Sequence, residues 1–248
     1  MNKTIIFCTD NTCPDPLFSA VVNHLKEFDL PIVSVSHEPL DLGTNICIGK
    51  RQRSWLCLYQ QLLIGLEVAD TDYISIAEHD CFYTQEHFDW MPPTDDIFYY
   101  NENIWLTQWS DTKHTELKGM FSMFPRQRLA LSQLVCSREL YLGTISKRLD
   151  IIDKDRRMIK GIDHIGEPGV SKVKRAQRWA GSGRCVYLKQ DLGKVLELEK
   201  YSTFKTELPN LDVRHDANFT GPRRGRDRRY ELHPWGKFED VLNRYTQV

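Results

Sequence analysis

Three consecutive residues, Glu78, His79 and Asp80, place two carboxylates and an imidazole directly after a short apolar run. Carboxylate oxygens on a rigid element are the ligands that Mg²⁺ or Mn²⁺ uses when it bridges a nucleotide diphosphate. Asp80 is therefore a candidate metal ligand, and Glu78 or His79 is a candidate to hold the ribose or a water beside the metal. The three residues could also be ordinary polar residues at the end of a strand. Their position in the fold therefore distinguishes the two interpretations.

A second polar cluster spans residues 212–221 and places Arg214 and His215 side by side. It offers a cation, metal-ligating side chains, an amide and a hydroxyl. Arg214 is a candidate for neutralising diphosphate charge as a leaving group departs, because guanidinium groups pair well with phosphates. A surface turn would explain Asn218 and Gly221 equally well, but a turn does not require Arg214 beside His215.

The elements that lead to the acidic tripeptide are typical of an α/β protein. Short apolar runs with β-branched residues predict strands, and apolar residues spaced by three or four predict helices. The predicted order is a strand over 3–9, a helix over 17–28, a strand over 31–36, a glycine-containing loop over 37–53, a helix from a Ser54 cap to about Ala69, and a strand over 73–77. Ligands bind beyond the carboxyl ends of strands in such sheets, and Glu78 lies at that point.

The rest of the chain is less regular. Further strands are predicted over 98–100 and 103–106, a helix over 129–149, and loops with short helices over 153–180. The expected fold class is α/β, with a mostly parallel central sheet flanked by helices and an irregular basic C-terminal part.

The formal net charge of −1 conceals a strong asymmetry. Residues 1–123 carry 7 Lys and Arg against 18 Asp and Glu, giving −11, and residues 124–248 carry 26 against 16, giving +10. The densest basic segments are 223–229 and 172–178. A basic half of this kind predicts an anionic partner such as a nucleotide diphosphate, a nucleic acid or an acidic glycan, although unlike faces of a dimer would also use it.

Neither a membrane span nor a disulfide framework is expected. No apolar run approaches the ~18 residues that cross a bilayer, and no N-terminal signal pattern is present. The seven cysteines are scattered without CxxC pairs, which predicts reduced, packed thiols. We therefore expect a soluble, cytoplasmic protein.

Four features together resemble the donor half of GT-A glycosyltransferases over about residues 3–110. They are Thr9 and Asp10 after the first strand, Ser34–Ser36 after the second, Gln60 and Gln61 in the helix, and the strand that ends in Glu78–Asp80. That family carries an acid-x-acid motif at this place, usually Asp-x-Asp, and this chain has Glu first. The similarity is to uncharacterised phage-type members. It implies a GT-A fold, a nucleotide-diphosphate sugar as donor, a hydroxyl acceptor, and Mn²⁺ or Mg²⁺ as cofactor.

The resemblance also implies roles for individual residues. Thr9 and Asp10 would contact the nucleobase or ribose, and Ser36 would lie beneath the nucleotide. Gln61 would either contact the ligand or form a satisfied amide in the core. In several GT-A enzymes a late histidine completes the metal shell, which nominates His215.

The two halves of the chain would then divide the work within one domain. Residues 1–123 would bind the donor, and residues 124–248 would bind the acceptor and complete the site. Glu167, in the turn sequence 166–169, is the candidate catalytic base. An inverting transfer needs such a carboxylate, whereas a retaining transfer can proceed without one, and a solvated turn carboxylate explains Glu167 equally well.

The acceptor remains open at this level. The basic half and the phage-like resemblance favour DNA that carries a hydroxymethylated pyrimidine, in a host cytoplasm. The alternatives are transfer to a saccharide or lipid-linked glycan, and a non-catalytic nucleic-acid-binding module. A nucleotidyltransferase is disfavoured because no Gly-rich phosphate loop follows the first strand.

Overall fold

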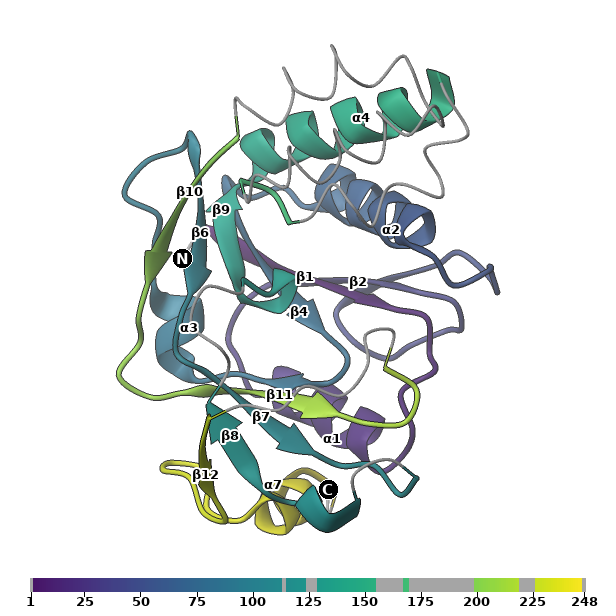
Figure 1. Cartoon of the computed structure of the whole chain (residues 1–248). Coiled ribbons are helices and arrows are strands. Elements are labelled where there is room, and N and C mark those ends of the chain that lie inside the picture. Colours follow the sequence, from purple (N-terminus) through teal and green to yellow (C-terminus); the bar gives the residue numbers. More distant parts are fainter. Residues whose placement is uncertain are drawn as a thin grey trace, which may run out of the picture.

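Two β-sheets, one of seven strands and one of five, organise the described part of the chain (Figure 1). The structure is a computed structural model. It describes residues 2–112, 115–123, 129–154, 167–169, 199–218 and 226–246. Strands from both ends of the chain enter each sheet, so neither half of the sequence forms a sheet by itself.

The larger sheet is mostly parallel, as the sequence predicts. Its strand order is β10-β6-β9-β4-β1-β2-β3. Every neighbouring pair is parallel except the two that involve β9. The strands are β1 (Lys3–Thr9), β2 (Ile32–Ser36), β3 (Thr44–Cys47), β4 (Tyr73–Glu78), β6 (Ile97–Asn101), β9 (Leu134–Ser137) and β10 (Lys200–Phe204).

The smaller sheet has the order β12-β8-β7-β11-β5. Its strands are β5 (Cys81–Phe82), β7 (Ile104–Gln108), β8 (Phe121–Met123), β11 (Asn210–Arg214) and β12 (Arg226–Arg229). β11 lies parallel to β7 and antiparallel to β5. Because β5 begins directly after Glu78–Asp80, this pairing brings residue 214 close to the end of β4.

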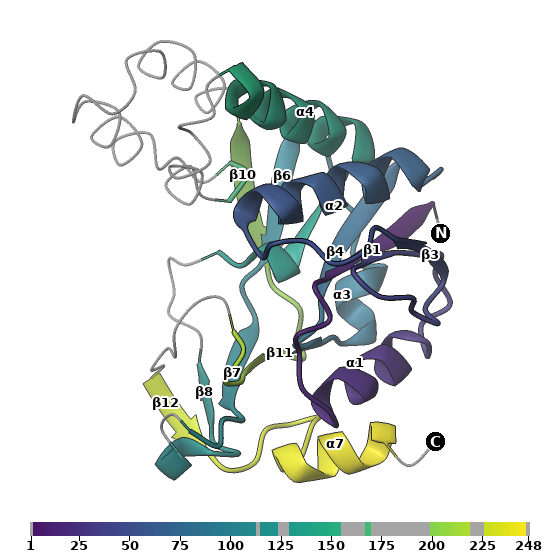
Figure 2. The same ribbon diagram turned by 90° about the vertical axis from the view of Figure 1, so that its right-hand side faces the viewer.

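Helices cover both faces of the larger sheet (Figure 2). α2 and α4 pack together on one face, and α1 lies on the other, with α7 packed against α1. The helices are α1 (Leu17–Leu25), α2 (Trp55–Val68), α3 (Gln85–Asp89), α4 (Arg138–Lys154) and α7 (Phe238–Thr246), with short 3₁₀ turns at Thr115–Leu117 and Leu131–Gln133. Among the described residues no helix is long and apolar enough to cross a membrane.

Side chains of β1 alternate between the two cores. Ile6 and Cys8 pack toward α2 and α4, whereas Ile5 and Phe7 pack toward α1 and α7. Burial on both faces explains why this strand reads as a continuous apolar run rather than as an alternating one. The predicted Ser54 cap is confirmed, since Ser54 Oγ accepts a hydrogen bond from the Cys57 amide at 3.1 Å.

Two sequence predictions are wrong in part. The predicted helix over 129–149 is a 3₁₀ turn, then β9, and the helix begins only at Arg138. Residues 134–137 instead fill the buried position between β4 and β6 in the sheet. Tertiary pairing there outweighs the helical spacing of their apolar side chains. The predicted loop over 37–53 contains β3, an edge strand whose residues are exposed or half-buried. The loops predicted over 153–180 lie mostly outside the described residues, although α4 extends to Lys154.

Gly65 sets the distance between α2 and β1. A Cβ there would lie 2.7 Å from Cγ2 of the buried Ile6. Gly65→Ala should therefore lower the free energy of unfolding by about 1–3 kcal/mol, the usual cost of overpacking a core. Gly143→Ala in α4 is the matched control, because no described atom lies within 4 Å of a Cβ at Gly143. Urea denaturation of both variants checks this, and equal stability of Gly65→Ala and wild type would contradict it.

His87 makes the fold sensitive to acid. It is fully buried among Tyr83, Phe88 and Phe204, and burial, helped by the charge of Lys3, lowers its pKa to about 3. The unfolded chain binds a proton at His87 below about pH 6.5 that the folded chain refuses until pH 3. The neutral His87 side chain therefore contributes fully to the free energy of unfolding above about pH 6.5. This contribution is lost as the pH falls from there toward 3.

His87→Phe should reduce the acid sensitivity. Between pH 6 and pH 5 the variant should lose about 1 kcal/mol less unfolding free energy than wild type, because one histidine contributes at most ~1.4 kcal/mol per pH unit. Urea denaturation at both pH values measures the difference. An identical pH slope for the two proteins would show that His87 does not titrate as described.

Candidate functional site

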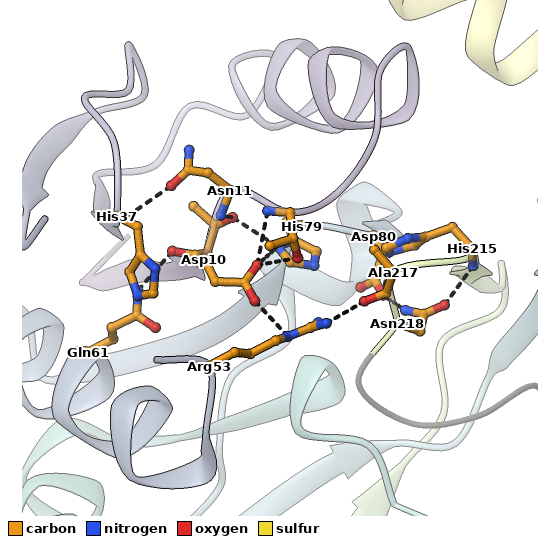
Figure 3. A network of polar contacts seen from close by, with 12 residues as sticks. Asp10, Asn11, His37, Arg53, Gln61, His79, Asp80, His215, Ala217 and Asn218 are labelled. Carbon is orange, nitrogen blue, oxygen red and sulfur yellow. Dashed lines mark hydrogen bonds and ion pairs between the residues drawn. The ribbon is translucent and has the colours of Figure 1, made fainter. Parts of the chain in front are cut away.

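A pocket lies at the carboxyl ends of β1 and β4, where they meet the end of β11 and the start of α2. Figure 3 shows polar contacts of its lining residues Asp10, Arg53 and Asp80. The pocket is open to solvent. The space between its lining residues, including the solvent at its mouth, is about 1010 Å³. Trp55, Leu58, Leu129 and Leu131 contribute apolar lining. Five carboxylates (Asp10, Glu78, Asp80, Glu167 and Asp212) and two guanidinium groups (Arg53 and Arg214) contribute the charged lining, which leaves a formal charge of −3 with neutral histidines.

Backbone pairing brings the two polar clusters of the sequence together. Leu211 and Asp212 of β11 lie opposite Phe82 and Cys81 of β5. The Val213 amide donates to the carbonyl of Asp80 at 2.8 Å. His215 therefore leaves β11 beside Asp80, and its Nε2 lies 3.7 Å from Asp80 Oδ2.

Asp80, His79 and His215 form a group that can hold a metal ion. One ligand atom from each lies within 4.8 Å of the others. His215 is 4% exposed and is absent from the lining of the pocket. Neither of its nitrogens has a hydrogen-bond partner within the described chain. Because a buried polar atom without a partner costs free energy, this geometry suits a ligand between the three side chains.

The turn that follows β11 is braced against this group. Asn218 Nδ2 donates to Asp80 Oδ2 at 2.6 Å, and Asn218 Oδ1 accepts from the His215 amide at 2.6 Å. Asp216 accepts hydrogen bonds from the Asp111 amide and from Ser110 and Thr112. The backbone around His215 is therefore tied to Asp80 and to residues 110–112.

Asp10 and Arg53 connect the end of β1 to the same turn. Arg53 Nε lies 2.6 Å from Asp10 Oδ2, and Arg53 Nη1 donates to the carbonyl of Ala217. Burial would raise the pKa of Asp10, but hydrogen bonds from Thr12 and the charges of His79 and Arg53 hold it below its ordinary value. Asp10 is thus an anion fixed at the pocket wall.

Thr9 and His79 are also brought together. Thr9 Oγ1 lies 2.8 Å from His79 Nδ1 and accepts from the Asn11 amide at 2.9 Å. Burial lowers the pKa of His79. With Nδ1 directed at Thr9, the Nε2 atom of His79 is the one left for a ligand.

Two predicted donor-site residues have structural partners. Gln61 Nε2 donates to the carbonyls of Thr9 and Val35 at 2.8 and 3.0 Å, so its amide group joins the ends of β1 and β2 while the residue also lines the pocket. Ser36 is fully buried, donates to the Glu38 carbonyl, and is absent from the lining of the pocket.

Arg214 and Asp212 form an ion pair at the back of the pocket. Both residues are buried, and Arg214 Nη2 contacts Asp212 Oδ2. Burial opposes the charge of Arg214, but Asp212 and Asp80 raise its pKa above the ordinary value. This cation is held permanently charged within the acidic lining.

The two carboxylates of the tripeptide differ in their proton affinity. Burial and the charges of Asp80, Asp212 and Glu167 raise the pKa of Glu78 well above its ordinary value. Burial would also raise the pKa of Asp80, but the neighbouring His215, His79 and Arg214 side chains hold it well below the usual range. Asp80 is therefore the residue of this motif that keeps its negative charge.

Sequence reasoning did not nominate Arg53, Asn218, Asp212 or His37. The cluster over 212–221 was the only signal for two of them, while Arg53 stands before the Ser54 cap in a segment predicted to be a loop. Of the basic segments, Arg228 and Arg229 are exposed on β12. Residues 221–225 and 170–180 lie outside the described part of the chain.

No family model matches the sequence, and no curated protein matches it. Solved structures with a similar course of the chain include the glycosyltransferase GlyE from Streptococcus pneumoniae TIGR4, at 10% identity and a TM-score of 0.46 over 99% of this chain and 60% of GlyE. A glycosyltransferase involved in glycosylation of the major capsid of PBCV-1 matches at 7% identity and a TM-score of 0.44 over 99% of both chains. TarS from S. aureus, in complex with UDP-GlcNAc, matches at 8% identity and a TM-score of 0.41 over 88% of this chain and 60% of TarS. This chain thus spans less than two thirds of GlyE and of TarS, and likeness of this degree assigns no activity to it.

Proposed function

We propose that this chain is a metal-dependent glycosyltransferase, which moves a sugar from a nucleotide-diphosphate donor to a hydroxyl acceptor. The observation that carries the proposal is that Asp80 and His79, which line a pocket with excess negative charge, each have a ligand atom within 4.8 Å of one in the buried His215 ring. A divalent cation would satisfy the His215 ring, whose nitrogens have no hydrogen-bond partner among the described residues, and would offset the lining carboxylates. A cation held at the carboxyl ends of strands then favours an anionic ligand such as a diphosphate.

The residues present fit Mn²⁺ better than Mg²⁺. Asp80 and His215 would hold the ion, and His79 lies beside them. Imidazole nitrogens suit transition metals, whereas Mg²⁺ favours oxygen ligands alone. When bound, such an ion supplies the positive charge that stabilises a departing diphosphate.

The other lining residues have matching roles in the proposal. Thr9 and Asp10 would contact the nucleoside, and Arg214 would balance charge on the diphosphate. In the inverting route Glu167 would take the proton of the acceptor hydroxyl. The acceptor oxygen then bonds to the anomeric carbon while the bond from that carbon to the diphosphate oxygen breaks, and its electron pair leaves with the diphosphate.

For the acceptor we propose DNA that carries a hydroxymethylated pyrimidine. The charge of +10 on residues 124–248 supports a polyanionic partner, and Arg228 and Arg229 are exposed on the edge strand β12. The enzyme would have to flip the base out of the duplex or act on an opened strand. A saccharide acceptor is the alternative.

Asp80→Asn and His215→Ala should each abolish Mn²⁺-dependent donor binding. For wild type at a donor concentration of 100 Kd, binding should add about 2.7 kcal/mol of stability, or roughly 5–10 °C in Tm for a chain of this size. A thermal-shift panel of UDP-, GDP-, ADP- and CMP-linked sugars, with and without Mn²⁺, measures this. Asp70→Asn, an exposed residue after α2, is the matched control. A full shift retained in both site variants would refute the metal assignment.

Arg228→Gln should weaken binding to duplex DNA and reduce its salt dependence. Each phosphate contact contributes roughly 0.9 to the slope of log K against log salt, so the slope should fall by about that amount. Fluorescence anisotropy at several salt concentrations measures it, with Lys205→Gln, an exposed residue after β10, as control. Wild-type protein without salt-dependent DNA binding would favour the saccharide acceptor.

A further inference from the structure

The turn that carries Glu167 is seated on the body of the protein by contacts that do not involve Glu167. The first comes from β6. Tyr100, whose side chain is fully buried, donates its hydroxyl hydrogen to the carbonyl of Pro168 at 2.7 Å. Tyr100 lies in β6, which is paired with β10 on one side and β9 on the other. This double pairing restricts movement of the Tyr100 backbone.

A second contact reaches the turn through a buried ion pair. The Gly169 amide donates to Glu199 Oε2 at 3.0 Å. Arg148 of α4 holds Glu199 with two hydrogen bonds, Nε to Oε1 at 3.1 Å and Nη2 to Oε2 at 2.6 Å. Arg148 is fully buried and also donates to the Tyr59 hydroxyl of α2 at 2.9 Å. The turn is thereby connected to both helices on this face of the sheet.

A third constraint is the backbone of Gly169 itself. Its φ is +76°, and a Cβ at this position would lie 2.7 Å from Cβ of Tyr201 and 3.0 Å from the carbonyl oxygen of Lys200 in β10. Both the conformation and the close approach require glycine. Any side chain would push the turn away from β10.

We propose that Tyr100, Gly169 and the Arg148–Glu199 pair are positioning residues, which hold the Glu167 carboxylate in the pocket as the base of the transfer. This inference rests on the proposed function. Buried ion pairs add little net stability compared with apolar packing, so stability alone does not explain the Arg148–Glu199 pair. Its effect is to present a carboxylate oxygen to the Gly169 amide, two residues from Glu167. Glu167 itself lines the same pocket as Asp80 and Arg214.

Gly169→Ala and Tyr100→Phe test the positioning role without touching Glu167. Each should reduce kcat for donor hydrolysis, in which water replaces the acceptor, by about 10- to 100-fold, since a 1 Å displacement of a reacting group has effects of that order. The KM for the donor should stay within about twofold, because the donor contacts are intact. The matched controls are Gly143→Ala on the exposed face of α4 and Tyr73→Phe, whose hydroxyl contacts Asp95 at the surface. Both controls should keep the wild-type kcat.

Amide hydrogen exchange of Gly169, followed by NMR, tests without any substrate whether Tyr100 and Glu199 hold the turn in place. We call these two contacts to the turn the clamp. Slow exchange in wild type that becomes fast in Tyr100→Phe supports the clamp, and fast exchange in wild type overturns it. Unchanged kcat in both variants, or a loss of kcat matched by an equal rise in donor KM, also overturns the positioning role. If wild type hydrolyses no nucleotide sugar, the proposed function fails, and the exchange result alone then decides whether the clamp exists.

Discussion

The pairing of β11 with β5 is the constraint on which the rest of the site depends. It joins residues more than 130 positions apart, through the hydrogen bond from the Val213 amide to the Asp80 carbonyl and the opposition of Asp212 and Cys81. β5 is only two residues long, and only His79 and Asp80 separate it from β4. As a result the end of the main sheet and the end of β11 share one corner, and the two polar clusters of the sequence become one site.

Charge explains why this corner is built as it is. Buried carboxylates are expensive unless cations or hydrogen bonds accompany them. Arg214 and Arg53 supply part of the compensation by pairing with Asp212 and Asp10. Asp80 is approached by the Asn218 amide and by His215, whose ring nitrogens have no hydrogen-bond partner within the described chain. The arrangement leaves a place for one more positive charge, and the proposed divalent ion would occupy it.

The first half of the fold could be predicted because local and tertiary signals agree there. β1 and β2 are apolar runs, and α2 has both a spaced apolar face and a Ser54 cap. β9 could not be recognised, since Leu134 and Val135 fit the spacing of a helix as well as that of a buried strand. β11 was not predicted, although polar and apolar residues alternate along it as in a half-buried strand. The burial of its polar residues as well depends on the Asp212–Arg214 ion pair, which only the fold creates.

The same division holds for the site. Asp80 could be nominated because it directly follows a predicted strand, and His215 because a family resemblance supplied its partner. Asn218 and Arg53 act through contacts with Asp80 and Ala217 that lie 138 and 164 residues away in the chain. Contacts between residues so far apart in the chain cannot be predicted from the spacing of residues in the sequence. The family resemblance predicts Ser36 beneath the nucleotide, and in the structure its hydroxyl donates to the nearby Glu38 carbonyl.

The most direct test of the central claim is a crystal structure of the protein soaked with Mn²⁺ and a nucleoside diphosphate, with anomalous diffraction recorded to locate the manganese. The account predicts one peak at coordination distance, about 2.0–2.3 Å, from the Asp80 carboxylate and the His215 ring, with the diphosphate on its open side. A nucleotide bound in the pocket without a peak there, or a peak away from both residues, would contradict it.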